Sequence, residues 1–151
     1  MDIVIGADHG GFKLKEYLKS FVKDLGHNVV DIGAASEEPS DYPDFAALVS
    51  EKVMNKEAEK GIILCGSGVG ACVTANKFPG IRASVCHDTY SAKQGVEHDD
   101  MNVLCLGARI VGEELAKELI KAFLNARFQS NVDRYKRRLN KVLDIEKKHL
   151  K

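Results

Sequence analysis

The sequence predicts an α/β fold: a Rossmann-like, doubly wound sheet of five parallel strands flanked by helices, followed by a C-terminal helix. Short apolar runs of strand length alternate along the chain with segments whose apolar residues recur every three or four positions. This alternation is typical of a parallel sheet that is covered on both faces. The chain has 151 residues, a length that favours one domain spanning 1–151 with a single core.

The elements are expected in a regular order. The first strand covers 3–5, and the helix after it carries Leu14, Leu18 and Phe21 at helical spacing until Gly26 ends it. The other strands are expected at 29–32, 61–65, 81–86 and 102–106, and the other helices at 45–53, 90–96 and 115–124, with a short helix ending near 78.

The C-terminal helix is expected at about 131–149. Its residues Val132, Tyr135 and Leu139 lie on one stripe, and this apolar face needs a surface to cover it. From Arg134 onward the chain holds eight basic and two acidic residues. The segment is therefore either a solvated terminal helix or a helix that lies near an anion.

The fold predicts where a ligand binds. Five such strands most simply adopt the order 2-1-3-4-5 with right-handed crossovers. Ligands of such sheets lie at the carboxyl ends of the two strands where the order reverses, here the first and third. The sequence Asp8-His9-Gly10-Gly11 follows the first strand, and Cys65 with the loop Gly66-Ser67-Gly68-Val69-Gly70 ends the third. We expect the two segments to border one crevice.

Composition excludes several classes of protein. With 44% hydrophobic and 29% charged residues, the chain is neither disordered nor collagenous. Lys and Arg together number 22, as do Asp and Glu, so we expect neither nucleic acid nor a membrane as a partner. The chain lacks an apolar stretch of about 20 residues and a signal-peptide pattern. These observations predict a cytoplasmic protein.

The four cysteines are expected to be free thiols. Cys65, Cys72, Cys86 and Cys105 show no CxxC spacing, which favours a reducing compartment over a disulfide framework. We interpret all of them except Cys65 as inert packing residues. No set of His, Cys and carboxylate residues has the spacing of metal ligands, so no metal site is expected.

The loop Gly66–Gly70 is the strongest local signal. Alternating glycines between a strand and a helix leave backbone N–H groups directed at one point, where an anion or oxyanion binds. Tight turns also use glycine for packing alone, so this signal is moderate by itself. Cys65 strengthens it, because a thiol beside a helix N-terminus loses its proton more readily than a free thiol.

A cysteine before a glycine-rich loop has three known uses. A phosphatase loop requires Arg six positions after the cysteine, but this position is Ala71. A dinucleotide fingerprint fits Gly66, Gly68 and Ala71, with Asp88 as the ribose-binding acid, and this nucleotide-binding alternative stays open. The third use is proton abstraction beside a carbonyl group, with Cys65 as base and the loop amides holding the enediolate oxygens.

Other side chains qualify as partners of this site. Asp8 and His9 supply an acceptor and an imidazole, although a capping Asp beside a surface His explains them equally well. His98 precedes the last strand and could act as acid or base in the same crevice, although a loop histidine is usually solvated. Arg134 and Arg138 lie one helical turn apart and could clamp a phosphate. The histidines at 27, 87 and 149 are interpreted as ordinary structural or surface residues.

Together these segments resemble the type B ribose-5-phosphate isomerases, a group of sugar-phosphate isomerases that includes the galactose-6-phosphate isomerase subunits. The resemblance runs from about 3 to 145. It is carried by Gly6-Ala7-Asp8-His9-Gly10-Gly11-Phe12, Asp41-Tyr42-Pro43, Ile63-Leu64-Cys65-Gly66-Ser67-Gly68-Val69-Gly70, Ala75-Asn76-Lys77, Gly80-Ile81-Arg82-Ala83, Asn102-Val103-Leu104 and Gly107-Ala108-Arg109-Ile110-Val111-Gly112.

The resemblance implies a role for each matching residue. Cys65 is the base that moves a proton between C2 and C1 through a cis-enediolate, and His98 helps to open the sugar ring. The oxyanion loop comprises Gly66, Ser67, Gly68, Val69 and Gly70; Asp8 and Tyr42 contact the sugar; His9, Arg109, Arg134 and Arg138 belong to the phosphate site. The last two arginines come from the neighbouring subunit, which implies a homodimer or a dimer of dimers. No metal or organic cofactor is implied.

Two departures from the family pattern concern the substrate. Asp99 stands where asparagine usually follows the catalytic histidine, and its carboxylate repels an enediolate unless it is protonated or turned away. The segment Ser130–Tyr135 replaces the usual Gly-Gly-Arg-His, which affects the placement of Arg134. We expect interconversion of D-ribose 5-phosphate and D-ribulose 5-phosphate. The alternative is another aldose, such as allose or galactose 6-phosphate or an unphosphorylated sugar.

Overall fold

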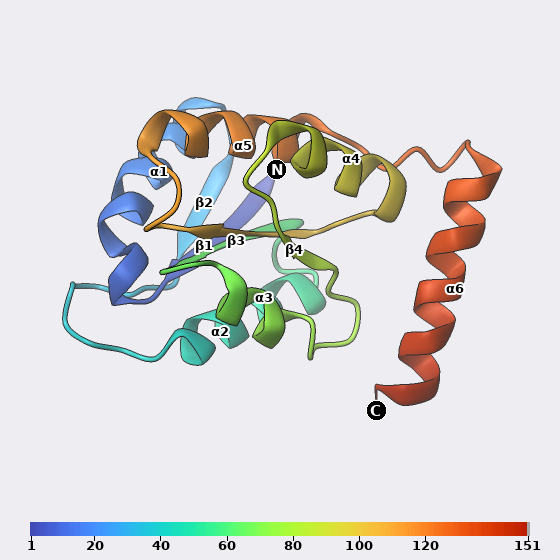
Figure 1. Cartoon of the computed structure of the whole chain (residues 1–151), viewed down its shortest axis with the longest axis horizontal. Coiled ribbons are helices and arrows are strands. Elements are labelled where there is room, and N and C mark those ends of the chain that lie inside the picture. The colour runs from blue at the N-terminus through green and yellow to red at the C-terminus, as the bar shows by residue number, and fades with distance from the viewer. Residues whose placement is uncertain (151) are drawn as a thin grey trace.

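The computed structural model describes residues 1–150, and Lys151 of the expected domain lies outside the described residues. Figure 1 shows a sheet with helices on both faces and a last helix standing apart. In chain order the elements are β1 (Asp2–Ala7), the 3-10 helix η1 (His9–Gly11), α1 (Phe12–Asp24), β2 (Asn28–Asp31), α2 (Tyr42–Met54), β3 (Lys60–Cys65), α3 (Val69–Ala75), β4 (Ala83–Val85), α4 (Thr89–Asp99), β5 (Val103–Gly107), α5 (Glu113–Asn125) and α6 (Asp133–His149). The predicted class, with five parallel strands, is confirmed.

The strand order is β2-β1-β3-β5-β4, so the predicted order 2-1-3-4-5 is wrong at its end. All five residues of β5 are buried, whereas β4 has three residues that are only partly buried. Burial of a Val or Leu side chain contributes about 1.5 to 3 kcal/mol, which favours the longer apolar strand in the centre. As a result Gly107, the last residue of β5, lies opposite Cys65 of β3.

Two apolar layers hold the helices on the sheet. Helices α1, α4 and α5 bury residues such as Leu18, Val96 and Phe123 against one face, and α2 and α3 bury Val49 and Ala71 against the other. Figure 1 shows the first three helices above the sheet and the other two below it. Because side chains of a strand alternate between faces, Cys65 points into the layer formed by α2 and α3.

The C-terminal helix α6 stands apart from these layers. It begins at Asp133, within two residues of the predicted start, and Figure 1 shows it beside the sandwich rather than on the sheet. Tyr135 and Leu139 are buried, and the Glu146 carboxylate accepts a hydrogen bond from the Gly80 N–H at 3.0 Å. Val142 and Ile145 stay exposed. Val142 of the predicted apolar stripe, and Ile145 beside it, therefore have no cover within residues 1–150.

Two helix boundaries differ from the prediction near candidate residues. Helix α2 begins at Tyr42, with Pro43 in its first turn, three residues before the predicted start. Proline suits this position because its missing N–H has no partner there in any case. Helix α4 extends to Asp99, so His98 lies in its last turn and not in a loop. Within residues 1–150 no helix is long and apolar enough to cross a membrane.

Candidate active site

The glycine loop after β3 holds the sulfur of Cys65. Gly68 has a φ of 82°, a left-handed conformation that glycine adopts without strain, and it is the N-cap of α3. Its N–H donates to Cys65 Sγ at 3.2 Å. A Cβ atom at position 68 would also lie 3.0 Å from the carbonyl carbon of Leu106. The loop can therefore form this contact only with glycine at its turn.

Further amides of the loop precede the regular hydrogen bonds of α3. Val69 N–H donates to Ser67 Oγ at 3.2 Å, and the first helical bond runs from Cys72 N–H to Gly68 O at 3.1 Å. The N–H groups of Gly70 and Ala71 lie between these two bonds, at a position where a helix N-terminus has no intrahelical acceptor. These two N–H groups are the ones available to a negatively charged oxygen, and the oxyanion role of the loop stays a prediction.

Asp8 and His9 lie at the end of β1. Asp8 is only 8% exposed, and its Oδ1 accepts from the N–H groups of Gly10 at 3.0 Å and Gly11 at 3.3 Å. The capping interpretation of Asp8 is therefore correct. The His9 N–H donates to Ser40 Oγ at 3.0 Å, and the Ser40 N–H donates to His9 Nδ1 at 3.1 Å. Ser40, which the sequence does not single out, holds the imidazole in place through its N–H, its hydroxyl and its carbonyl oxygen, which lies 3.2 Å from His9 Nδ1.

A cleft of about 370 Å³ connects the ends of β1, β3 and β5. It is lined by Asp8, Tyr42, Cys65, Gly66, Ser67, Gly70, Arg109 and Ile110. Cys65 is 4% exposed, so its sulfur belongs to the wall of the cleft and not to open solvent. The Tyr42 ring packs directly on the Gly70 backbone, because a Cβ atom at position 70 would lie 2.5 Å from a ring carbon.

The turn after β5 brings Arg109 to this cleft. Ala108 N–H donates to Cys65 O at 2.8 Å, and Arg109 N–H donates to Gly66 O at 3.1 Å. Ile110 also borders the cleft, and sequence reasoning missed it. These contacts depend on β5 lying beside β3. The predicted strand order placed the residues after 86 there, so only the family resemblance, which singles out Arg109, pointed to this turn.

The remaining candidates form a second group on α4 and α6. His98 stacks on Tyr135 with ring centroids 3.9 Å apart, and Gln94 Nε2 lies 3.0 Å from His98 Nδ1. The Arg134 guanidinium lies over the Tyr135 ring, with its carbon 4.6 Å from the ring centroid. Arg138 is exposed on the same helix. None of these side chains lines the Cys65 cleft within one chain.

Asp99 belongs to the second group. It is exposed and lines two hollows beside Arg82, on α4 next to His98. One of these hollows, of about 500 Å³, lies between α6 and the segment 81–83 and is lined by the apolar residues Leu139, Val142 and Ile145.

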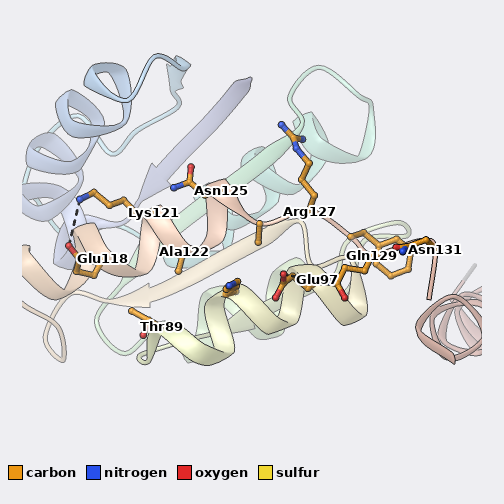
Figure 2. Close-up of a pocket in the computed structure, with 12 residues that line it drawn as sticks. Thr89, Glu97, Glu118, Lys121, Ala122, Asn125, Arg127, Gln129 and Asn131 are labelled. Atoms are coloured by element: carbon orange, nitrogen blue, oxygen red, sulfur yellow. Dashed lines mark hydrogen bonds and ion pairs between the residues drawn. The ribbon is translucent and has the colours of Figure 1, made fainter. Parts of the chain in front are cut away.

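Another hollow contains none of the candidate residues. It measures about 780 Å³ and lies between α4, α5 and the segment 126–131. Figure 2 shows Lys121 turned toward Glu118, with which it forms an ion pair at 3.7 Å, while Arg127 extends to the other side of the ribbon from Glu97. Its lining contains neither cysteine nor histidine, the two residue types expected to carry the reaction, so the smaller cleft is the better candidate.

The dinucleotide interpretation fits the structure poorly. Ala71 is fully buried against the core, and the Asp88 carboxylate caps α4 by accepting from the Ser91 N–H at 2.6 Å. The acid proposed for a ribose hydroxyl is therefore already used inside the fold. Among residues 1–150, no three His, Cys, Asp or Glu side chains are grouped as a metal site.

The four cysteines are free, and Cys72 differs from its predicted role as inert packing. Cys72 is partly exposed, and the pKa of its thiol is lowered to about 6, mainly by a hydrogen bond from the Cys105 thiol and further by the Val85 N–H and the Asn76 amide, against the effect of burial. The same contact, together with burial, raises the pKa of Cys105 well above its ordinary value. Burial also raises the pKa of Cys86.

Comparisons with known proteins cover nearly the whole chain. The family model "Ribose/Galactose Isomerase" matches residues 3–142. Ribose-5-phosphate isomerase B of Escherichia coli is 42% identical over 146 residues, which are 97% of each protein. D-erythrulose-4-phosphate isomerase of Pectobacterium atrosepticum is 41% identical over 131 residues, 85% of this chain and 86% of that protein. The structure of Clostridium thermocellum ribose-5-phosphate isomerase B, 45% identical, matches with a TM-score of 0.95 over 99% of both chains.

Proposed function

The chain belongs to the ribose/galactose isomerase family of sugar-phosphate isomerases, and we propose that it interconverts D-ribose 5-phosphate and D-ribulose 5-phosphate. The observation that carries this proposal is the position of Cys65. Its sulfur accepts an amide hydrogen bond at the wall of a cleft whose other walls hold Asp8, Tyr42 and Arg109. A base, polar groups for sugar hydroxyls and a cation for phosphate thus meet in one place.

The proposed reaction is a proton transfer between neighbouring carbons. The Cys65 thiolate takes the proton from C2 of the open-chain aldose, and the electron pair forms the C1–C2 double bond of a cis-enediolate. The former carbonyl oxygen at C1 becomes negatively charged, and the amides of the Gly66–Gly70 loop stabilise this charge. Cys65 returns its proton to C1, while the proton of the C2 hydroxyl moves to the oxygen on C1 and C2 becomes the carbonyl carbon of the ketose. The cysteine ends in its starting state, so the reaction needs no external acid or base beyond the site.

We infer that a second copy of the chain completes the site. His98 and the arginines of α6 lie away from the Cys65 cleft of their own chain, yet the family resemblance assigns them to the same reaction. The stack of His98 on Tyr135 places His98 beside α6, the helix that carries Arg134 and Arg138. The exposed Val142 and Ile145 and the hollow they line support a homodimer in which α6 and α4 of one copy face the cleft of the other.

The proposed roles divide between the two halves. Cys65, the loop amides, Asp8 and Tyr42 hold the sugar carbons, and His98 of the second copy opens the furanose ring. Phosphate is bound by His9 and Arg109 of the first copy together with the arginine pair of α6. Asp99 follows His98 on α4, and the family resemblance assigns it to a substrate contact.

Exchange of the C2 proton tests the role of Cys65. Ribose 5-phosphate is incubated with the protein in D₂O, and deuterium at C2 is followed by proton NMR. We expect Cys65→Ala to slow the exchange by at least about 100-fold, the usual effect of losing a general base, while ribose 5-phosphate still raises the melting temperature. Cys72→Ala is the control and should retain exchange. Wild-type exchange in Cys65→Ala would remove Cys65 as the base.

The five-carbon substrate is a more specific proposal than the reaction class. The relatives from Escherichia coli and Clostridium thermocellum carry the name ribose-5-phosphate isomerase B, whereas the relative from Pectobacterium atrosepticum is an isomerase of D-erythrulose 4-phosphate. A turnover panel of four-, five- and six-carbon aldoses, each with and without phosphate, decides between them. Turnover of a four-carbon phosphate alone would keep the reaction and replace the substrate.

A further inference from the structure

His87 accepts a hydrogen bond that the sequence does not predict. It follows the edge strand β4, which pairs with β5 as far as Val85 and Cys105. Two residues further along, the imidazole replaces the missing backbone acceptor: the Gly107 N–H donates to His87 Nε2 at 3.0 Å. A nitrogen that accepts this bond carries no proton, so a neutral His87 has its proton on Nδ1.

The backbone of Gly107, at the end of β5, packs against the loop that borders the cleft. A Cβ atom at this position would lie 2.7 Å from the Ser67 carbonyl oxygen, so the two backbones are in direct contact. The following two residues donate to Cys65 O at 2.8 Å and to Gly66 O at 3.1 Å, and Ile110 N–H closes the turn on Gly107 O at 2.9 Å. A displacement of Gly107 is therefore transmitted to the oxyanion loop and to Arg109.

We propose that His87 is a positioning residue, which holds the Gly107–Ile110 turn against the Cys65–Ser67 loop and thereby places Arg109 in the cleft. The imidazole does not line the cleft itself, so it acts through the turn and not on the substrate. This inference rests on the proposed function, because it assigns Arg109 to the phosphate of the substrate. Displacement of a binding group by about 1 Å is enough to lower the rate about 100-fold.

Two substitutions separate the hydrogen bond from the bulk of the side chain. His87→Gln keeps an acceptor at the position of Nε2, whereas His87→Leu keeps an apolar side chain and removes the acceptor. We expect His87→Leu to raise KM for ribose 5-phosphate at least about tenfold with a smaller loss in kcat, and His87→Gln to stay within about threefold of the wild type. Equal damage in both variants, or none in His87→Leu, would overturn the proposal.

A double-mutant cycle with Arg109→Ala tests the route of the effect. If His87 acts by placing Arg109, then His87→Leu should change KM by less than about twofold once Arg109 is already removed, because the two effects are not additive. If His87 had a merely structural role, His87→Leu would raise KM by the same factor with and without Arg109. Full additivity therefore contradicts the proposal, even when the melting temperature of His87→Leu falls.

A readout without turnover keeps this test separate from the proposed function. ¹⁵N NMR of the imidazole should show Nε2 without a proton and Nδ1 with one, and the Gly107 amide should exchange with solvent faster in His87→Leu than in His87→Gln. If the wild type turns over no aldose phosphate, the proposed function fails while these measurements still decide whether His87 holds Gly107. A protonated Nε2 in the neutral imidazole would overturn the inference.

Discussion

His98 stacks on Tyr135, with ring centroids 3.9 Å apart and ring planes inclined by 23°. This contact joins the last turn of α4 to the first turn of α6, and it separates His98 from the Cys65 cleft of its own chain. Cys65 and His98, the two residues proposed to carry the reaction, are therefore expected to meet only across a subunit boundary.

Mixing two inactive variants tests this arrangement. Cys65→Ala and His98→Asn are unfolded and refolded together. In a shared site, random pairing should restore about a quarter of the wild-type specific activity, because half of the dimers are mixed and each mixed dimer has one intact site. The matched control combines Cys65→Ala with Asp8→Asn, which alters the same half of the site and should restore nothing. Mixed dimers without activity would place both residues in one chain.

Arg138→Ala should weaken binding of the phosphate. A hydrogen bond to a charged group contributes about 1.5 to 3 kcal/mol, so KM for ribose 5-phosphate should rise about 10- to 100-fold with little change in kcat. Turnover of unphosphorylated ribose, where measurable, should stay the same. Arg137→Ala is the control, since Arg137 is the neighbouring exposed arginine on α6. An equal loss with both sugars would argue against a phosphate contact.

Asp99→Asn should raise kcat/KM for ribose 5-phosphate. The change removes a carboxylate charge beside His98 and adds an amide donor, which favours the negatively charged enediolate. Steady-state kinetics with four- and five-carbon aldose phosphates measures the effect. Asp133→Asn removes the same charge from an exposed position on α6 and should leave the kinetics unchanged. A fall in kcat/KM would mean that Asp99 has a positive role with the natural substrate.

Cys72 should react with iodoacetamide already at neutral pH. With a pKa of about 6, roughly nine in ten Cys72 thiols are deprotonated at pH 7, and a thiolate is the reactive form. The rate of alkylation in a Cys65→Ser background should therefore level off above pH 7, with a midpoint near pH 6. Cys105→Ala removes the main hydrogen bond and should move the midpoint upward. A rate that keeps rising beyond pH 8 contradicts this assignment.

Lys15 and Asp31 should respond unequally to substitution. Lys15 is 1% exposed and Asp31 is 25% exposed, and they form an ion pair at 2.7 Å. Asp31→Asn removes the closest charged partner of a buried ammonium group, which keeps the Ala34 carbonyl at 2.8 Å and Glu16 at 3.4 Å, so it should lower the free energy of unfolding by about 3 kcal/mol. Lys15→Met leaves a carboxylate that keeps its bond to Lys19 at 2.9 Å, and should cost about 1 to 2 kcal/mol. Urea unfolding measures both, and the reverse order would contradict the assignment.

The same pair gives a pH dependence. Burial acts to raise the pKa of Asp31, but hydrogen bonds from Lys15, Lys19 and the Gly33 N–H together lower it below its ordinary value. A lowered pKa in the folded state means that this contribution to stability is present above the pKa of the unfolded chain. It is lost as the pH falls through the pKa of the folded protein. The difference in stability between the wild type and Asp31→Asn should therefore shrink in acid.

The sequence predicted the part of the site that depends on neighbouring strands at the centre of the sheet. Cys65 and Asp8 end strands β3 and β1, which pair in the structure, and their adjacency follows from the reversal of the strand order. The continuous apolar run in each strand is sufficient for this, because all residues of β1 after Asp2 and all residues of β3 after Lys60 are buried.

The rest required tertiary information. The pattern of β4 and β5 does not say which strand lies at the edge, because this depends on how much apolar surface each can bury in the assembled sheet. The contact between His87 and Gly107 follows from that choice, as does the approach of Arg109 to Gly66. The stack of His98 on Tyr135 depends on the direction of α6 after the segment 126–132, and no local sequence pattern fixes this direction.

The separation of α6 from the sheet has a consequence for how activity depends on protein concentration. If the arginines of α6 serve the cleft of another copy, a chain can be completely folded and still lack a working site. Specific activity would then fall on dilution as subunits dissociate, with no change in helix content. The fraction of active protein in the cell would be set by the amount of chain present and by the strength of its self-association.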